Sequence, residues 1–235
     1  MRIVLWNCDG GLARKPKVDF LKALEPDVAV LPEIREQHIE GLAPRDSRWV
    51  TNNSKTDSPK GLGVLTFKEF SLEDFPRDEE MEIYFPLRVR SQDFSFNLLA
   101  VWNFYYASKT GRFKGVRGKN SVEYTSADHY RSFLADPSLL VGDLNFGPDF
   151  GRGFTKYCGV LNQIGLKSLY HQDSDLDVGQ TKLQTYKPNR GGKKYHLDHI
   201  FGSQFFQKRL ARFYCEPLEK VPFSDHAALV IDFKL

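Results

Sequence analysis

Polar residues that could do chemistry follow three apolar runs of this 235-residue sequence. Asn7 and Asp9 follow RIVLW, Glu33 follows DVAVLP, and Asp143 and Asn145 occur in VGDLNF after SLLV. Each has an ordinary structural explanation, because Asp and Asn side chains readily accept hydrogen bonds from the backbone amides of turns. Taken singly they indicate strand ends, and they indicate a site only if the fold brings them together.

Further candidates lie toward the carboxyl terminus, with Asp198 in YHLDHIF and with Asp225 and His226 in FSDHAALV. Open α/β folds bring the loops at strand ends around one crevice. Carboxylates gathered there would repel one another unless a cation lay among them. Oxygen ligands suit Mg²⁺ or Mn²⁺ rather than zinc. Such a group could hydrolyse a phosphate ester, with a carboxylate taking a proton from water and an imidazolium stabilising the developing charge.

The elements that must position these residues are mostly strands. Apolar and β-branched runs predict strands over 2–7, 27–33, 61–67, 82–90, 94–106, 138–143, 184–188, 195–203, 211–219 and 226–233. Helical spacing of apolar residues predicts helices over 17–26, 126–136 and 154–165. The continuous apolar run 27–33 is typical of a strand buried on both faces. This order favours two packed sheets with helices on their outer faces, in a single domain spanning residues 1–235.

Bulk composition constrains the partners only weakly. The chain has 33 Lys and Arg against 30 Asp and Glu, so its net charge of +3 does not by itself indicate nucleic acid or membrane. Cys8, Cys158 and Cys215 are scattered, which predicts neither a disulfide framework nor a zinc site. The first apolar stretch is too short for a secretory leader, and no run approaches a membrane span. We expect a soluble cytoplasmic protein with no membrane partner and no N-terminal regulatory extension, and we assume a monomer.

Five blocks carry a family resemblance: WNCDG, PDVAVLPE, GDLN, LDH and SDH. In this order and at these intervals they resemble the signature blocks of the endonuclease/exonuclease/phosphatase superfamily, which includes exonuclease III-like apurinic endonucleases and pancreatic-type deoxyribonucleases. GDLN alone is a weak signal, whereas five blocks in sequence are a strong one. The resemblance implies the DNase I-like fold, an α/β four-layered sandwich with two central mixed β-sheets, and a phosphoesterase that uses Mg²⁺ or Mn²⁺.

The resemblance also implies roles for matching residues. Glu33 would be the principal metal ligand, and Asp9 and Asp225 would lie close to the metal. Asn7 would hold the metal shell or the phosphate.

In the catalytic group that the resemblance implies, Asp143 would orient and deprotonate the attacking water, and Asn145 would hydrogen-bond the water or the phosphate. His226 would contact the scissile phosphate, and Asp198 would hold its imidazole in position.

One block departs from the family pattern. Many members carry a His or Tyr that contacts the phosphate after the strand that resembles FNLLAV, whereas this chain has Trp102 and then Asn103. The indole N–H of Trp102 can donate a hydrogen bond but cannot titrate. Trp102 therefore either replaces the missing group as a fixed donor or packs in the core while Asn103 or Tyr105 reaches the phosphate.

Two basic segments, 109–120 and 187–194, are predicted to border the crevice. They could grip a phosphate backbone or simply be solvated loops. The candidate phosphate-binding residues in them are Arg112, Lys114, Arg117, Arg190 and Lys193. Three other histidines, His171, His196 and His199, are interpreted as packing residues.

We therefore predict a metal-dependent nuclease that hydrolyses phosphodiester bonds of DNA or RNA. The alternative enzyme is a phosphatase of small phosphorylated metabolites or inositol phosphates, since the basic loops suit those anions too. A third hypothesis is a binding protein of the same fold that has lost catalysis, which only the Trp102 substitution encourages.

Overall fold

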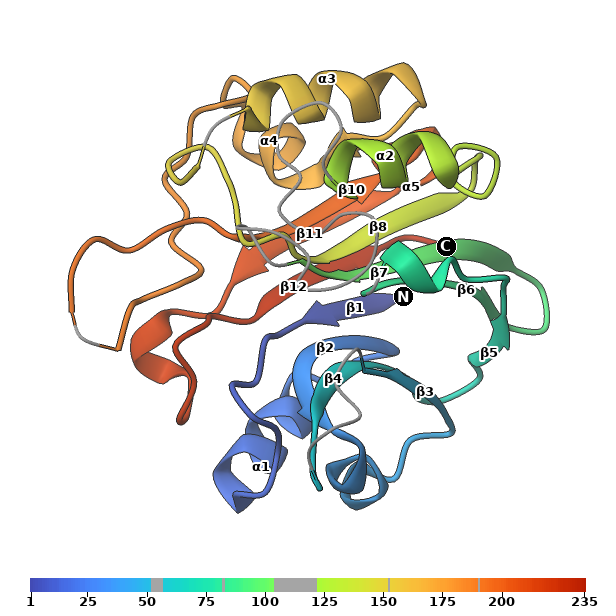
Figure 1. Ribbon diagram of the computed structural model, residues 1–235. Helices are drawn as coiled ribbons and strands as arrows, with labels where there is room; N and C mark the ends of the chain where they lie inside the picture. Colours follow the sequence, from blue (N-terminus) through green and yellow to red (C-terminus); the bar gives the residue numbers. More distant parts are fainter. Residues whose placement is uncertain (52–56, 82, 104–121, 152, 190) are drawn as a thin grey trace.

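Two mixed β-sheets packed face to face form the centre of the computed structural model, which describes residues 1–51, 57–81, 83–103, 122–151, 153–189 and 191–235 (Figure 1). The first sheet has the order β11 (Leu210–Cys215), β12 (Leu229–Phe233), β1 (Arg2–Leu5), β2 (Val28–Arg35), β4 (Lys60–Thr66) and β3 (Asp46–Val50). The second has the order β5 (Ser71–Asp74), β6 (Tyr84–Arg90), β7 (Ser95–Trp102), β8 (Ser138–Asp143), β10 (Asp198–Gly202) and β9 (Lys167–Ser168).

Each sheet contains one parallel pair, β1 with β2 and β7 with β8, and its other pairs are antiparallel. Strand alternation divides the apolar residues between two faces of each sheet. In β1, Ile3 and Leu5 belong to the core between the sheets, and Val4 belongs to the core on the outer face.

Helices cover both outer faces (Figure 1). The first sheet is covered by α1 (Lys15–Ala23) and the short helices η1 (Glu36–His38) and η2 (Glu40–Leu42). The second sheet carries α2 (Val122–His129), α3 (Phe154–Gln163), α4 (Leu169–Ser174) and α5 (Gln204–Gln207). The four-layered α/β sandwich predicted from the sequence is therefore confirmed.

The predicted elements differ from the observed ones mainly at the edges. The strand predicted over 184–188 forms only isolated bridges, from Tyr186 to Tyr195 and to His226. The helix predicted over 126–136 begins at Val122 and ends at His129. Sequence analysis missed the short elements β9, α4 and α5. It also missed β3 and β5, whose partly exposed, charged sequences DSRWV and SLED lack a clear apolar alternation. Both lie at sheet edges, where charged side chains are common because they discourage pairing with other chains.

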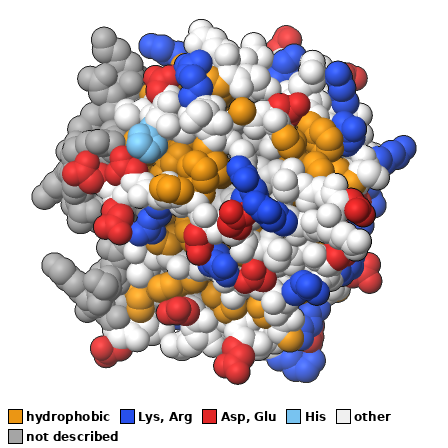
Figure 2. Space-filling view, turned by 90° about the vertical axis from the view of Figure 1, so that its right-hand side faces the viewer, with side chains coloured by type: hydrophobic (Ala, Val, Ile, Leu, Met, Phe, Trp, Pro, Cys, Tyr) orange, Lys and Arg blue, Asp and Glu red, His pale blue; other side chains and the backbone are white. Residues whose placement is uncertain are grey.

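Charged side chains of both signs are interspersed with apolar ones on the face that Figure 2 shows, which is the right-hand side of Figure 1. In Figure 1, β1 runs from the marked N-terminus toward the left, so the end of β1 lies at the opposite edge. No helix within the described ranges is long and apolar enough to cross a membrane.

Candidate active site

The predicted catalytic side chains gather where the core between the sheets ends. Because side chains alternate along a strand, each of them points to the same face of its sheet as a core residue two positions away. These pairs are Leu5 with Asn7, Val141 with Asp143, and Ile200 with Asp198. Asp198 begins its strand rather than ending it, because β10 runs antiparallel to β8 and pairs Asp198 directly with Asp143. The edge is therefore built from the ends of some strands and the beginnings of others.

Asp143 is buried and held by several donors. Its Oδ2 accepts hydrogen bonds from Asn7 Nδ2 at 3.0 Å and from Asn145 Nδ2 at 3.1 Å, and its Oδ1 accepts one from the Asn145 backbone N–H at 2.9 Å. Burial and the nearby Asp198 carboxylate raise the pKa of Asp143 to about 7. The Gly-Asp-x-Asn segment is thus both a turn and part of a polar cluster. Gly142 is required before it, since a β-carbon there would lie 2.0 Å from the Val101 carbonyl oxygen.

His226 and Asp198 form a buried pair, with His226 Nδ1 2.8 Å from Asp198 Oδ2. His226 Nε2 lies 3.9 Å from Asp143 Oδ2. Burial lowers the pKa of His226, but the Asp198 and Asp143 carboxylates outweigh it and raise the pKa to about 10. The ring is therefore an imidazolium at neutral pH, and its Nε2–H can donate to an anion.

Glu33 joins this cluster through a break in strand alternation. Alternation alone would turn Glu33 toward the outer face, but a β-bulge between Pro32 and Ile34 and a φ of 62° at Glu33 redirect it. Glu33 Oε1 accepts a hydrogen bond from Asn7 Nδ2 at 3.1 Å. Asn7 thereby links the Glu33 and Asp143 carboxylates.

Lys60 is a site residue that sequence analysis missed. Its ammonium contacts Glu33 Oε2 and lies 3.4 Å from Asp9 Oδ1, so it places a positive charge between two predicted metal ligands. The topology explains why Lys60 reaches the site: β4 pairs antiparallel with β2, so β4 begins at Lys60 beside the end of β2. Recognising it required knowing that these strands are neighbours.

Two groups of residues could hold a cation here. Asp143, Asp198 and His226 offer ligand atoms that all lie within 4.8 Å of one another. The other group is Glu33 and Asp9 with Asp225, whose pKa is raised by burial and by the neighbouring Asp9 and Glu33 carboxylates. A site of carboxylate oxygens alone suits a hard cation better than one that includes imidazole.

Trp102 lies at the end of β7, in the core between the sheets, with 6% of its surface exposed. This position supports the packing alternative. The next residue, Asn103, is also buried and donates from Nδ2 to the Leu144 carbonyl at 3.2 Å, while its own carbonyl accepts from Asn145 Nδ2 at 2.7 Å. Asn103 therefore helps to position Asn145. Tyr105, the other candidate, lies outside the described residues.

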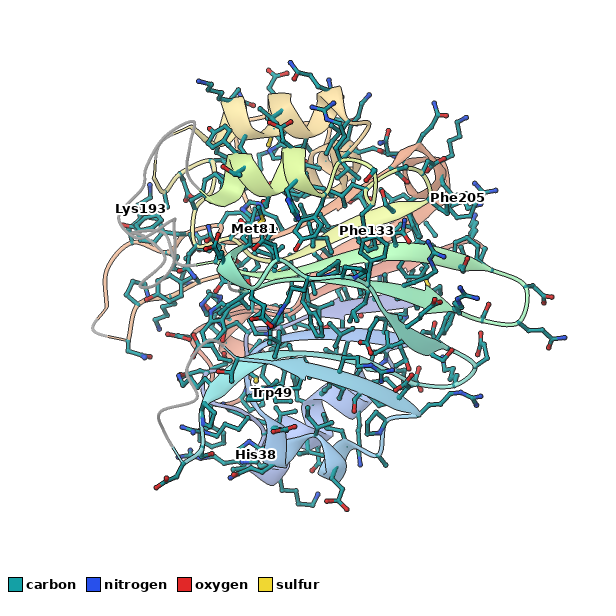
Figure 3. The ribbon with its side chains drawn as sticks, turned by 45° about the vertical axis from the view of Figure 1, so that its right-hand side comes forward. His38, Trp49, Met81, Phe133, Lys193 and Phe205 are labelled. Carbon is teal, nitrogen blue, oxygen red and sulfur yellow. The ribbon has the colours of Figure 1, made fainter. Side chains whose placement is uncertain are left out.

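Most of the predicted basic residues, Arg112, Lys114, Arg117 and Arg190, also lie outside the described residues. Lys193 is described, and its Nζ lies 5.4 Å from the centroid of the Tyr195 ring. Tyr195 bridges to Tyr186, whose ring centroid is 4.8 Å from that of His226. Figure 3 shows Lys193 at the edge of the sandwich opposite Phe205. Lys193 is therefore linked to His226 through Tyr195 and Tyr186 rather than in contact with it.

Two other histidines pack next to Asp198 as neutral groups. His196 and His199 are buried and stacked, with ring centroids 4.3 Å apart. Burial lowers the pKa of His199 to about 3 and holds that of His196 well below its usual value. This arrangement supports the packing role predicted for both.

We expect acid to destabilise the fold through these histidines. A histidine whose pKa is lowered in the folded state contributes stability above its unfolded pKa, and that stability is lost as pH falls from about 6.5 toward 3. His199→Gln should therefore reduce the pH dependence of the free energy of unfolding by up to about 1.4 kcal/mol per pH unit. Urea denaturation at pH 7, 6 and 5 measures this slope. His129→Gln, at an exposed position on α2, is the matched control, and equal slopes for both variants would contradict the prediction.

Comparisons with known proteins find similar folds but no similar sequence. No protein family model matches the sequence, and no curated protein matches it. The endonuclease domain of TRAS1, a telomere-specific non-LTR retrotransposon, has a TM-score of 0.70 and 12% identity, over 100% of this chain and 98% of that one. The 3' phosphatase NExo from Neisseria, bound to a product DNA hairpin, has a TM-score of 0.70 and 17% identity over 100% of both chains. An AP endonuclease from Archaeoglobus fulgidus has a TM-score of 0.69 and 12% identity over 100% of both chains.

Identities this low establish a shared fold and leave the reaction to be argued from the site. The match extends over the whole of this chain in each case. The chain therefore has the fold of these proteins, the DNase I-like α/β sandwich that the sequence blocks predicted.

Proposed function

We propose that this protein is a divalent-metal-dependent nuclease that hydrolyses phosphodiester bonds of DNA or RNA. The observation that carries the proposal is the hydrogen-bonded chain from Glu33 through Asn7 to Asp143, beside the pair of His226 and Asp198. It combines a proton acceptor, an imidazolium and paired carboxylates at one edge of the sandwich. Groups of these kinds accelerate the hydrolysis of an anionic phosphate ester.

Glu33 and Asp9 are the residues that would hold Mg²⁺ or Mn²⁺, with Asp225 close by. The contacts of the Lys60 ammonium with both carboxylates support a cation position between them. Carboxylate oxygens are also the ligands that these cations prefer. When bound, the ion neutralises charge on the phosphoryl oxygens.

The remaining steps belong to the side chains. Asp143 accepts the proton of the attacking water. Asn145 accepts a hydrogen bond from that water through Oδ1, because its Nδ2 already donates to Asp143 Oδ2 and to the Asn103 carbonyl. His226 donates from Nε2 to a phosphoryl oxygen, because its Nδ1 is engaged by Asp198. The pairing through Nδ1 fixes the orientation of the ring, so Asp198 is a positioning residue.

Matched structures lend support to a nucleic acid substrate. Two are named as endonucleases, and the 3' phosphatase NExo is bound to a DNA hairpin product. Those activities belong to those proteins. They favour nucleic acid over small metabolites as the first substrates to test here.

The test is cleavage of supercoiled plasmid and of an oligonucleotide with one abasic site, in Mg²⁺ and in Mn²⁺, with and without chelator. We expect cleavage that a chelator abolishes. The same preparations are tested on phosphorylated metabolites and inositol phosphates. Hydrolysis of these small esters without cleavage of nucleic acid would reject the nuclease proposal in favour of the phosphatase alternative. Binding without turnover of any substrate would favour the binding protein.

Lys60 should weaken metal binding, because a metal ion at Glu33 and Asp9 must displace its ammonium. Ion pairs near the surface are each worth about 0.2–1 kcal/mol, so the two that Lys60 makes are worth about 0.4–2 kcal/mol. Lys60→Met should therefore tighten the Kd for Mn²⁺ by about 2- to 30-fold. Titration of the substrate-free protein, followed by the electron paramagnetic resonance of free Mn²⁺, measures this Kd. Lys68→Met, which removes a lysine paired with Asp27, is the matched control. An unchanged or weaker Kd in Lys60→Met would contradict the prediction.

A further inference from the structure

A hollow of about 420 Å³ opens beside the candidate metal ligands. Its volume lies within the range of small-molecule sites, about 300–1,000 Å³. Asp9 lines it on the side of the active site, and the roles assigned above leave the rest of it unused. The other lining residues that matter here are Arg14, Lys17, Asn189, Phe223 and Ser224.

Phe223 lines this hollow and has an unfavourable backbone conformation. It is 56% exposed, and its backbone has a φ of 53°, in the left-handed region that L-residues rarely adopt. Such a conformation is unfavourable for a non-glycine residue, and an exposed ring recovers little of that through burial. Backbone outliers of this kind often occur where a side chain is presented to a ligand.

The turn that carries Phe223 is tied to the catalytic residues. Ser224 Oγ donates to the Asn7 carbonyl at 2.8 Å and accepts from the His226 backbone N–H at 3.1 Å. The position of the Phe223 ring is therefore set relative to Asn7 and His226. A ligand held by the ring would be aligned with the group that these residues act on.

Arg14 supplies a second flat surface. Its guanidinium carbon lies 4.4 Å from the centroid of the Phe223 ring. A guanidinium can stack on an aromatic ring and still donate hydrogen bonds in its own plane to a phosphate. Together the two side chains offer stacking and an anion-binding group.

The loop that supplies Arg14 and Lys17 to the lining is already ordered. Lys17 is buried, and its Nζ donates to the carbonyls of Cys8 and Asp9. The Leu12 backbone N–H donates to His38 Nδ1 at 3.1 Å. Because these contacts fix the loop before ligand arrives, binding would not have to order it.

We propose that this hollow is a nucleotide subsite, in which the base adjoining the scissile phosphate stacks on the Phe223–Arg14 pair. The inference rests on the proposed nuclease function and specifies its substrate class. An exposed phenylalanine selects for flat, aromatic ligands, since stacking on an aromatic ring is available to every nucleobase and to no inositol phosphate. Because any base can stack in this way, the subsite would select for nucleic acid but not for a particular base sequence.

The experiment compares two single-stranded oligonucleotides, each with a single cleavable phosphate. They differ only at the nucleotide next to that phosphate, which has a base in one oligonucleotide and is an abasic tetrahydrofuran in the other. With the wild-type protein we expect a KM about 5- to 100-fold lower when the base is present. Phe223→Leu should lose this difference while its kcat on the abasic oligonucleotide stays unchanged. Phe223→Trp should retain it.

Phe75→Leu, which replaces another exposed phenylalanine, is the matched control and should behave as wild type. Thermal melting checks that each variant is folded. An undiminished preference for the base in Phe223→Leu would overturn the subsite and leave the nuclease standing, because the abasic oligonucleotide reports cleavage by itself. Failure of the wild type to cleave either oligonucleotide would overturn the subsite, and failure to cleave the plasmid as well would overturn the nuclease proposal with it.

Discussion

Replacing Asp143 by asparagine should lower kcat on the cleaved substrate by about 10²- to 10⁴-fold, the range that a positioned general base contributes. An amide cannot accept the proton of the attacking water. Asp143 Oδ2 accepts hydrogen bonds from Asn7 Nδ2 and Asn145 Nδ2. An amide nitrogen at that position would be a donor facing two other donors. Single-turnover kinetics at saturating enzyme measure the chemical step directly.

Substrate binding and folding should survive this substitution. The shape of the side chain is kept, and removing a buried negative charge relieves its desolvation. Asp149→Asn is the matched control, because Asp149 lies in the next turn, accepts from the His196 backbone N–H through Oδ1 and has no assigned role in the chemistry. Turnover by Asp143→Asn within a few-fold of wild type would reject Asp143 as the general base.

Replacing His226 by glutamine should lower kcat by about 10²- to 10³-fold, as expected when one preorganised donor to the transition state is lost. The carboxylates of Asp198 and Asp143 keep His226 an imidazolium at neutral pH, and an amide cannot supply that charge. The expected change is in kcat rather than in KM, because the donor acts on charge that develops during the reaction. Steady-state kinetics separate the two.

Asp198 should act only through His226. Asp198→Asn is expected to lower kcat, and the double variant Asp198→Asn/His226→Gln should lose about as much as His226→Gln alone, since residues that act as a unit are not additive. His129→Gln, on the exposed face of α2, controls for loss of a histidine. Fully additive losses in the double variant would show that Asp198 and His226 act independently.

The resemblance carried by the five sequence blocks, and not local pattern by itself, predicted the proposed catalytic group; strand alternation agrees with that prediction. Asn7, Asp143 and Asp198 are in phase with core residues of their strands, so alternation alone places them on the buried face at a point where apolar sequence stops. A polar residue at such a position is costly unless it has partners. The hydrogen bonds of Asn7 and Asp143 and the pairing of Asp198 with His226 supply them.

The order of the apolar runs likewise predicted the layers. Alternating and continuously apolar strands separated by a few amphipathic helices can bury their faces in few ways, and two packed sheets covered by helices is one of them. The structure confirms this architecture. Two edge strands, β3 and β5, were not predicted because their half-exposed residues carry little periodic signal, whereas the edge strand β11 was.

Tertiary structure alone decided how the site is completed. The bulge that turns Glu33 inward interrupts alternation, so no periodic reading could orient that side chain. Lys60 reaches Glu33 because β2 and β4 are antiparallel neighbours, and Phe223 faces the hollow because its turn is bonded to Asn7, 217 positions from Ser224 along the chain. Sequence patterns record which face a residue prefers, whereas these contacts depend on strand pairing between distant segments, which only the folded chain specifies.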